Sequence, residues 1–138
     1  MPGSLETIVV SGEVLLALVE RARSRPDSEI VGFLSGPQRG VATRDVPLTN
    51  AFGDTSTFLA DPHTQFLAER RIAALGEEIV AIYHSHPAGD ATFSDLDVHF
   101  ASAWSCAHIV IGLQPTPEAR AYIVRPGAKV VEVSLTTA

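Results

Sequence analysis

Short apolar runs and amphipathic segments alternate along this chain. The apolar runs are rich in β-branched and aromatic residues and are bounded by Gly, Pro, Asn or Asp, which is typical of β-strands. Seven such runs are predicted as strands, over Glu6–Val10, Ile30–Leu34, Val41–Leu48, Ile79–His86, His108–Leu113, Ala119–Val124 and Val130–Ser134. The second and third runs are joined by Gly36–Gly40, which predicts a hairpin turn.

Three other segments carry helix signals. Apolar residues recur at helical spacing after Ser11, a typical N-capping residue, and predict a helix to about Arg23. Asp61 followed by a proline predicts a helix to about Leu75. Ser94 predicts a third helix, to about Ser102. Strands alternating with three helices indicate one three-layer α/β domain over residues 1–138, with a mixed sheet flanked by helices.

Composition and charge narrow the classes of function. The 138 residues carry a formal net charge of −6, so the chain lacks the excess of basic residues that binding to nucleic acid or an anionic membrane needs. No apolar run approaches membrane-spanning length, and the N-terminus lacks the pattern of a signal peptide. We therefore expect a cytoplasmic protein. Cys106 is the single cysteine, lies among apolar residues and is expected in the core.

The stretch from Ile79 to Phe100 contains the candidate chemistry. Residues two apart on a strand point to the same face, so His84 and His86 should lie side by side. A Pro/Gly turn follows, and then Ser94 and Asp97 open the next helix. The return of the chain could bring the Asp97 carboxylate beside the two imidazoles. Two imidazoles and one carboxylate form a three-ligand zinc set of the catalytic type.

Each part of this pattern also has an ordinary structural interpretation. The spacing of Ser94 and Asp97 is that of a helix cap, and a lone histidine at a strand end is more often structural than a ligand. The combination of HSHP at residues 84–87 with the serine and aspartate downstream is much more specific than either part.

At these residues the chain resembles the JAMM (MPN+) metallopeptidases. Their motif is a glutamate, then H[ST]HP, six residues and SxxD; here it is Glu29, HSHP at 84–87, residues 88–93, Ser94 and Asp97. The resemblance implies that His84, His86 and Asp97 bind Zn²⁺. It also implies that Glu29 is the general acid and base, that Ser94 stabilises the oxyanion, and that the fold is related to that of cytidine deaminases. Deamination itself is not expected, because those enzymes use cysteine-rich zinc sites.

The resemblance extends over roughly Glu6 to Val124. Residues 29–36 match the pattern ExCGxLxG of bacterial members, with Val31 in place of the cysteine, a change expected to affect packing more than chemistry. Further matching positions are Asn50, Phe58, Asp61 and Pro62.

Several other polar residues compete for a role. Glu77 and Glu78 are rivals to Glu29 as the base, but they lie at the opposite end of the histidine strand. His63 is expected on the surface, with a role near the substrate as the alternative. His99 and Trp104 are expected to be packing or surface residues.

The resemblance also implies a class of substrate. Small stand-alone bacterial members act on ubiquitin-like sulfur carriers, at the amide bond that follows a C-terminal Gly-Gly, in pathways with an E1-like adenylating enzyme. The extended tail could pair with Thr57–Leu59 as an added strand, next to Phe58. Two alternatives stay open: another amidase on the same fold, such as a relative of RadC, and a non-catalytic MPN scaffold. The sequence leaves the oligomeric state open.

Overall fold

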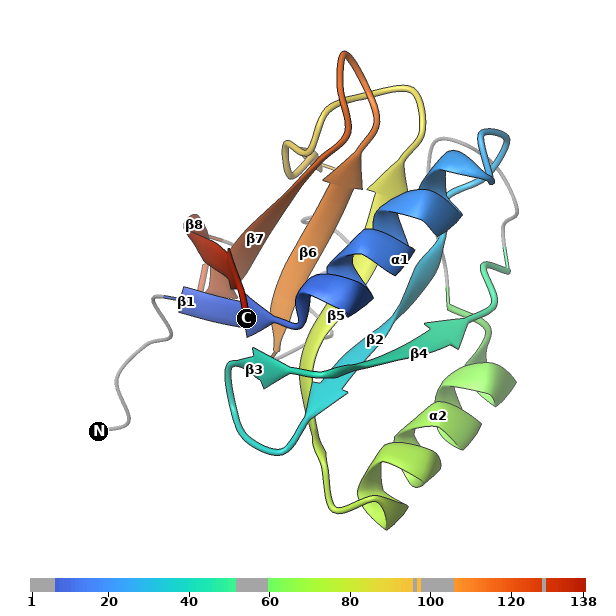
Figure 1. Ribbon diagram of the computed structural model, residues 1–138, viewed down its shortest axis with the longest axis vertical. Helices are drawn as coiled ribbons and strands as arrows, with labels where there is room; N and C mark the ends of the chain where they lie inside the picture. The colour runs from blue at the N-terminus through green and yellow to red at the C-terminus, as the bar shows by residue number, and fades with distance from the viewer. Residues whose placement is uncertain (1–6, 52–59, 96, 98–105, 128) are drawn as a thin grey trace.

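The computed structural model describes residues 7–51, 60–95, 97, 106–127 and 129–138. Within these residues, ten helices and strands are defined (Figure 1). In order they are β1 (Thr7–Val10), α1 (Gly12–Arg23), β2 (Val31–Gly36), β3 (Val41–Ala42), β4 (Arg44–Leu48), α2 (Pro62–Ala74), β5 (Glu78–His86), β6 (Ala107–Gly112), β7 (Glu118–Arg125) and β8 (Lys129–Thr137).

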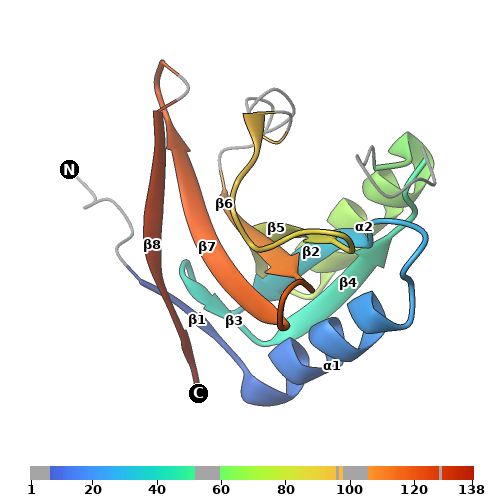
Figure 2. The same ribbon diagram turned by 90° about the horizontal axis from the view of Figure 1, so that it is seen from above.

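The strands form one mixed sheet in the order β3-β1-β8-β7-β6-β5-β2-β4. Neighbouring strands are parallel in the pairs β1/β3, β1/β8 and β5/β6 and antiparallel in the others. Helices α1 and α2 cover opposite faces of the sheet (Figure 2). The predicted mixed sheet between helical layers is thus confirmed.

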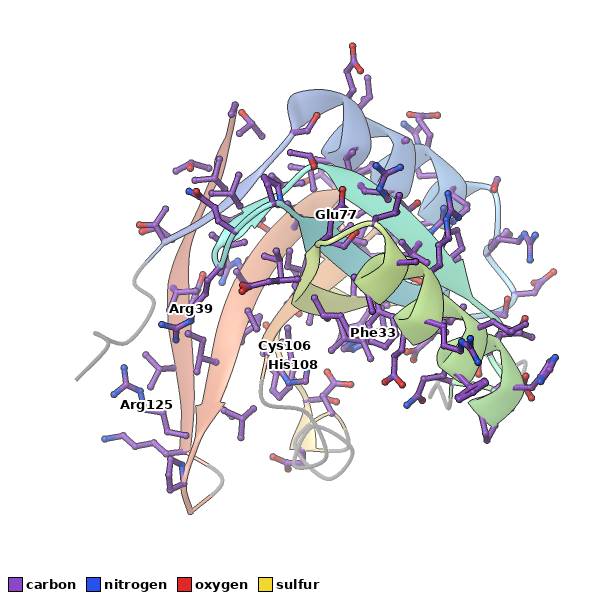
Figure 3. The ribbon with its side chains drawn as sticks, turned by 90° about the horizontal axis from the view of Figure 1, so that it is seen from below. Phe33, Arg39, Glu77, Cys106, His108 and Arg125 are labelled. Carbon is purple, nitrogen blue, oxygen red and sulfur yellow. The ribbon has the colours of Figure 1, made fainter. Side chains whose placement is uncertain are left out.

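The two-residue alternation of strand side chains separates two cores. On the face covered by α1, Leu34 and Tyr83 pack in one cluster with Leu18 of the helix. On the face covered by α2, Phe33 and Ile82 pack in another cluster with Ile72 of the helix. Figure 3 shows Phe33 beside α2. Consecutive residues of one strand therefore face different layers.

The predicted strand over residues 41–48 is divided in the structure. β4 pairs with β2 as a hairpin, but β3 leaves the hairpin and pairs with β1. A Cβ built on Gly36 would overlap the carbonyl of Val41, so the close crossing of the two segments depends on this glycine. The division arises from a contact with β1, which lies far away in the sequence.

The helices begin where the sequence predicts, but only one of the two predicted N-cap residues described next makes a side-chain capping hydrogen bond. Asp61 caps α2, because its Oδ2 accepts a hydrogen bond from the Thr64 N–H at 3.0 Å. Ser11 occupies the N-cap position of α1, but its side chain makes no capping hydrogen bond, so the predicted capping contact is wrong. Of the third predicted helix, Asp95 and Asp97 are described and both are helical, while 98–102 lie outside the described residues.

Two further expectations can be compared with the structure. Cys106 is half-buried rather than central, and packs beside the cluster under α2. Burial raises the pKa of its thiol to about 11. Among the residues described here, no helix is long and apolar enough to cross a membrane.

Candidate functional site

The pairing of β2 with β5 brings Glu29 to the histidines. In this antiparallel pair Val31 is the partner of His84. Ser85 holds the register beyond the last pair, because its Oγ accepts a hydrogen bond from the Ile30 N–H at 2.9 Å and its N–H donates to the Ile30 carbonyl at 3.1 Å. Glu29 therefore lies at the end of β5, and a carboxylate oxygen of Glu29 and a ring nitrogen of each histidine all lie within 4.8 Å of one another.

The carboxylate of Asp97 reaches the two imidazoles as well. Its Oδ1 lies 2.9 Å from His84 Nε2, and its Oδ2 lies 3.1 Å from His86 Nε2. The two Nε2 atoms are 3.2 Å apart. His84, Glu29 and Asp97 are all buried, at 1%, 3% and 6% exposed, and only His86 is partly open. Nitrogen and oxygen atoms from two distant parts of the chain thus converge on one point.

The spacing of these three side chains fits a tetrahedral zinc ion. With bonds of about 2.0–2.1 Å, the ligand atoms of such an ion lie about 3.3 Å apart. The two Nε2 atoms are 3.2 Å apart, close to that value, and each lies slightly nearer, at 2.9 and 3.1 Å, to a different oxygen of Asp97. The donor set, two imidazoles and a carboxylate, is also one that zinc accepts.

A hydrogen bond to the backbone fixes the tautomer of His86. Its Nδ1 lies 2.9 Å from the carbonyl oxygen of Asp90, which can only accept a hydrogen bond, so Nδ1 carries a proton. In the neutral ring, Nε2 then presents a lone pair toward an oxygen of Asp97 and toward Nε2 of His84. Lone pairs facing one another repel, and a proton on Nε2 of His84, a second proton on His86 or a metal ion between the atoms would each reduce the repulsion. The Asp90 carbonyl thereby orients a candidate ligand.

Ser94 and Asp97 form a reciprocal cap. The Ser94 N–H donates to Asp97 Oδ2 at 2.9 Å, and the Asp97 N–H donates to Ser94 Oγ at 3.0 Å. These bonds hold the carboxylate toward the histidines. The Ser94 hydroxyl accepts in this contact, so its own proton can still be donated to another group. The structural and the functional interpretation of this pair are therefore compatible.

The electrostatics of the cluster follow from burial and chiefly from the Asp97 carboxylate. Burial lowers the pKa of His84, although its contact with Asp97 acts in the opposite direction. Burial acts to lower the pKa of His86 as well, but hydrogen bonds to Asp97 and to the Asp90 carbonyl outweigh burial and raise it. Burial acts to raise the pKa of Asp97, but the two imidazoles hold it below its usual value. Asp97 is therefore ionised at neutral pH.

All five residues singled out in the sequence lie in or beside this cluster: Glu29, His84, His86, Ser94 and Asp97. Their roles stay predictions. The rival Glu77 lies at the other end of β5 and binds Ser35 at 2.8 Å and Arg44 at 3.1 Å (Figure 3). His63 is exposed on the first turn of α2. Phe58, His99 and Trp104 lie outside the described residues.

Sequence reasoning assigned no role in the site to several supporting residues. Asn50 Nδ2 donates to the Glu29 carbonyl at 3.0 Å, and Ser85 holds the neighbouring residue. His108, only 2% exposed, lies at the start of β6, on the same face as His84 (Figure 3). Alternation along β6 could have placed His108 on one face, but only the pairing with β5 shows which face.

A cavity of about 360 Å³ adjoins Glu29. It lies between the C-terminal end of α1, the start of β2 and the end of β4. Arg25 and Asn50 are among the residues that line it. Among the described residues of the cluster, only Glu29 lines this cavity.

Comparisons with known proteins show the family of this chain. Residues 11–124 match the family model described as prokaryotic homologs of the JAB domain. The CysO-cysteine peptidase of Mycobacterium tuberculosis is 29% identical over 129 residues, which cover 91% of this chain and 88% of the relative. A probable TtuB-protein conjugate cleaving protease of Thermus thermophilus is 34% identical over 108 residues, covering 78% of this chain and 69% of the relative.

Solved structures show the same fold. A protein from Desulfitobacterium hafniense has a TM-score of 0.84 at 26% identity, over 95% of this chain and 92% of that one. A JAB1/MPN domain protein from Archaeoglobus fulgidus has a TM-score of 0.60 at 19% identity, over 94% of this chain and 98% of that one. The family model spans most of the chain, including every residue of the cluster. This confirms the family predicted from the motif, and the chain belongs to the prokaryotic homologues of the JAB domain.

Proposed function

We propose that this protein is a zinc-dependent peptidase that hydrolyses the amide bond after the C-terminal Gly-Gly of a ubiquitin-like sulfur carrier. The convergence of His84, His86 and Asp97 at separations that suit a tetrahedral ion, with Glu29 beside them, carries the proposal. The names of the two curated relatives support the class of substrate, since one describes a peptidase acting on CysO-cysteine and the other a protease acting on TtuB-protein conjugates.

The metal ligands are His84, His86 and Asp97 in this proposal. Zinc held there would supply Lewis-acid activation of water and of the amide carbonyl. The Asp90 carbonyl holds the ring of His86 in the tautomer that leaves Nε2 available, and the Ser94 N–H orients the carboxylate.

Glu29 is the general base and then the general acid. It removes a proton from the attacking water and returns it to the leaving amine, a role worth about 10²–10⁴ in rate. Asn50 binds the carbonyl and Ser85 binds the N–H of the peptide group between Glu29 and Ile30, and together they position the backbone that carries the carboxylate. The Ser94 hydroxyl donates a hydrogen bond to the oxyanion that develops on the attacked carbonyl.

The substrate tail lies extended beside Glu29 in this proposal. The cavity that adjoins Glu29 supplies the room, and the segment of Thr57–Leu59, outside the described residues, is the proposed pairing partner. A cytoplasmic location and an E1-like adenylating enzyme in the same pathway complete the proposal.

The test uses a sulfur carrier extended by a few residues after its Gly-Gly, together with the zinc content of the protein. Mass spectrometry should show that the wild type trims the carrier to its bare Gly-Gly. Glu29→Gln should keep one zinc per chain and trim about 10²–10⁴ times more slowly. Glu77→Gln is the matched control, because that glutamate is bound to Arg44 away from the cluster and its loss should leave trimming unchanged.

Other outcomes discriminate the alternatives. Zinc without trimming by the wild type would keep a metal site and discard the sulfur-carrier substrate. A folded chain that cannot be loaded with zinc would favour the non-catalytic scaffold. Near-full activity of Glu29→Gln would show that another group is the base.

A further inference from the structure

The segment that joins β5 to the helical Asp95 and Asp97 carries groups of the site at both of its ends. We call residues 87–94 the return loop. Near its start, the Asp90 carbonyl accepts the hydrogen bond of His86 Nδ1 at 2.9 Å. At its end, Ser94 holds the carboxylate of Asp97. The position of this loop therefore decides whether the third ligand meets the two histidines.

Strand β6 approaches the return loop closely at Gly112. A Cβ built on Gly112 would overlap the backbone of Asp90 and Ala91 and would lie 2.7 Å from the Cα of Asp90. Just beyond β6, the N–H groups of Leu113 and Gln114 both donate to the Gly89 carbonyl at 3.0 Å. The loop thus lies directly on the end of β6, at a distance that only glycine permits.

Strand β7 contributes a polar contact to the same loop. The hydroxyl of Tyr122 donates a hydrogen bond of 2.6 Å to the carbonyl of Ala91. Ala91 is fully buried, and Tyr122 is only 6% exposed. Burial raises the pKa of Tyr122, so its hydroxyl stays protonated and remains a donor at neutral pH. A buried carbonyl that loses such a donor is left without compensation for its lost hydration.

Aromatic rings complete the contact between the loop and the sheet. The ring of Phe93 lies 5.2 Å from that of Tyr122, 5.4 Å from that of His108 and 6.5 Å from that of His84, between ring centroids. One end of this row is a strand residue far from the motif, and the other end is a candidate ligand. The row packs the residue before Ser94 against β6 and β7.

We propose that Tyr122 and Gly112 are positioning residues of the metal site, which hold the return loop where the Asp90 carbonyl and the Asp97 carboxylate meet the two histidines. The inference rests on the proposed function, since it concerns the affinity for zinc. Neither residue belongs to the motif, and both act on the site through the loop.

The experiment measures zinc affinity and not only turnover. Metal-free protein is titrated with Zn²⁺ in competition with a chromophoric chelator, and the Co²⁺-loaded form is recorded by absorption spectroscopy, which reports ligand geometry. Tyr122→Phe keeps the ring and removes the hydroxyl. Its zinc dissociation constant should rise about 10-fold, because the loss of a residue that holds a metal ligand in place typically weakens binding by about 10- to 100-fold. Its Co²⁺ spectrum should change as well. Gly112→Ala should raise the constant further, by up to about 100-fold.

Tyr83→Phe is the matched control. Its hydroxyl is also buried and hydrogen-bonded, but to Asp45 on the opposite face of the sheet. Urea unfolding of the metal-free proteins should show losses of stability of similar size for the two tyrosine variants, whereas only Tyr122→Phe should lose zinc affinity.

Three results would overturn the inference. Wild-type zinc affinity and an unchanged Co²⁺ spectrum in Tyr122→Phe would overturn the inference, even if Gly112→Ala failed to fold. An equal loss of zinc affinity in Tyr83→Phe would show that affinity merely follows stability. A wild-type chain that binds no zinc would overturn the proposed function and this inference together. The first two results would overturn the inference alone and leave the proposed function standing.

Discussion

Tyr83 and His84 are neighbours on β5, yet they belong to polar clusters of opposite kinds. On the face covered by α1, the Tyr83 hydroxyl donates to Asp45 at 2.6 Å and accepts from Arg21, which also pairs with Asp45. On the other face, His84 meets His86 and Asp97, whose nitrogen and oxygen lone pairs converge. The first cluster contains its own cation, the guanidinium of Arg21, and the second brings two imidazoles and a carboxylate within hydrogen-bonding distance.

The difference indicates how to separate structural polar clusters from functional ones. In the Tyr83 cluster, a guanidinium, a carboxylate and a hydroxyl satisfy one another as donors and acceptors. In the cluster of His84, the imidazole nitrogens and carboxylate oxygens lie 2.9–3.2 Å apart and are oriented by contacts from outside, such as those from Asp90 and Ser94. A buried cluster arranged in this way is suited to bind an ion rather than to stabilise the fold.

The largest expected effect comes from His84 itself. His84→Gln should abolish stoichiometric zinc binding and lower turnover by at least about 10²-fold, because the variant removes a ligand whose loss cannot be compensated inside the core. Metal analysis and the carrier assay measure the two effects. Full zinc content together with full turnover in this variant would exclude His84 as a ligand.

The next effect is a pH dependence of stability from His108. Burial lowers the pKa of His108 to about 4, so between pH 6.5 and 4 the unfolded chain binds a proton that the folded chain does not bind. The free energy of unfolding should therefore fall as pH drops through that window, by up to about 3 kcal/mol from this residue. His108→Leu should show a correspondingly shallower dependence in urea unfolding measured at several pH values. Parallel curves for the two proteins would show that His108 does not titrate as stated.

A smaller effect is expected in the cluster that contains its own cation. Tyr83→Phe should lower the free energy of unfolding by about 1–3 kcal/mol, because Asp45 loses a buried donor. Turnover at 25 °C should stay at the wild-type level. Reduced turnover at unchanged zinc content would mean that the two faces of the sheet are coupled, which would break the comparison.

The smallest change in stability is expected at Ser94. Ser94→Ala should cost about 1 kcal/mol as a lost helix cap, and should lower turnover as well if the hydroxyl serves the oxyanion. Asp61→Ala removes the corresponding cap of α2 and is the control, with a similar loss of stability and unchanged turnover. Equal turnover in the two variants would leave Ser94 with a structural role alone.

The sequence by itself determined the local parts of this protein. Alternation along β5 puts His84 and His86 on one face, and the spacing of Ser94 and Asp97 forms a cap, because both depend on backbone geometry within a few residues. The motif also identified the family correctly, since it records residue types at fixed spacings.

The tertiary structure decided what joins these parts. Glu29 reaches the histidines through the register of β2 on β5, 55 residues away, and the return loop lies on Gly112 and Tyr122 of strands that follow it. The break between β3 and β4 likewise depends on pairing with β1. Such contacts form only when distant segments pack together, so the sequence around a residue does not show which distant residue it will contact.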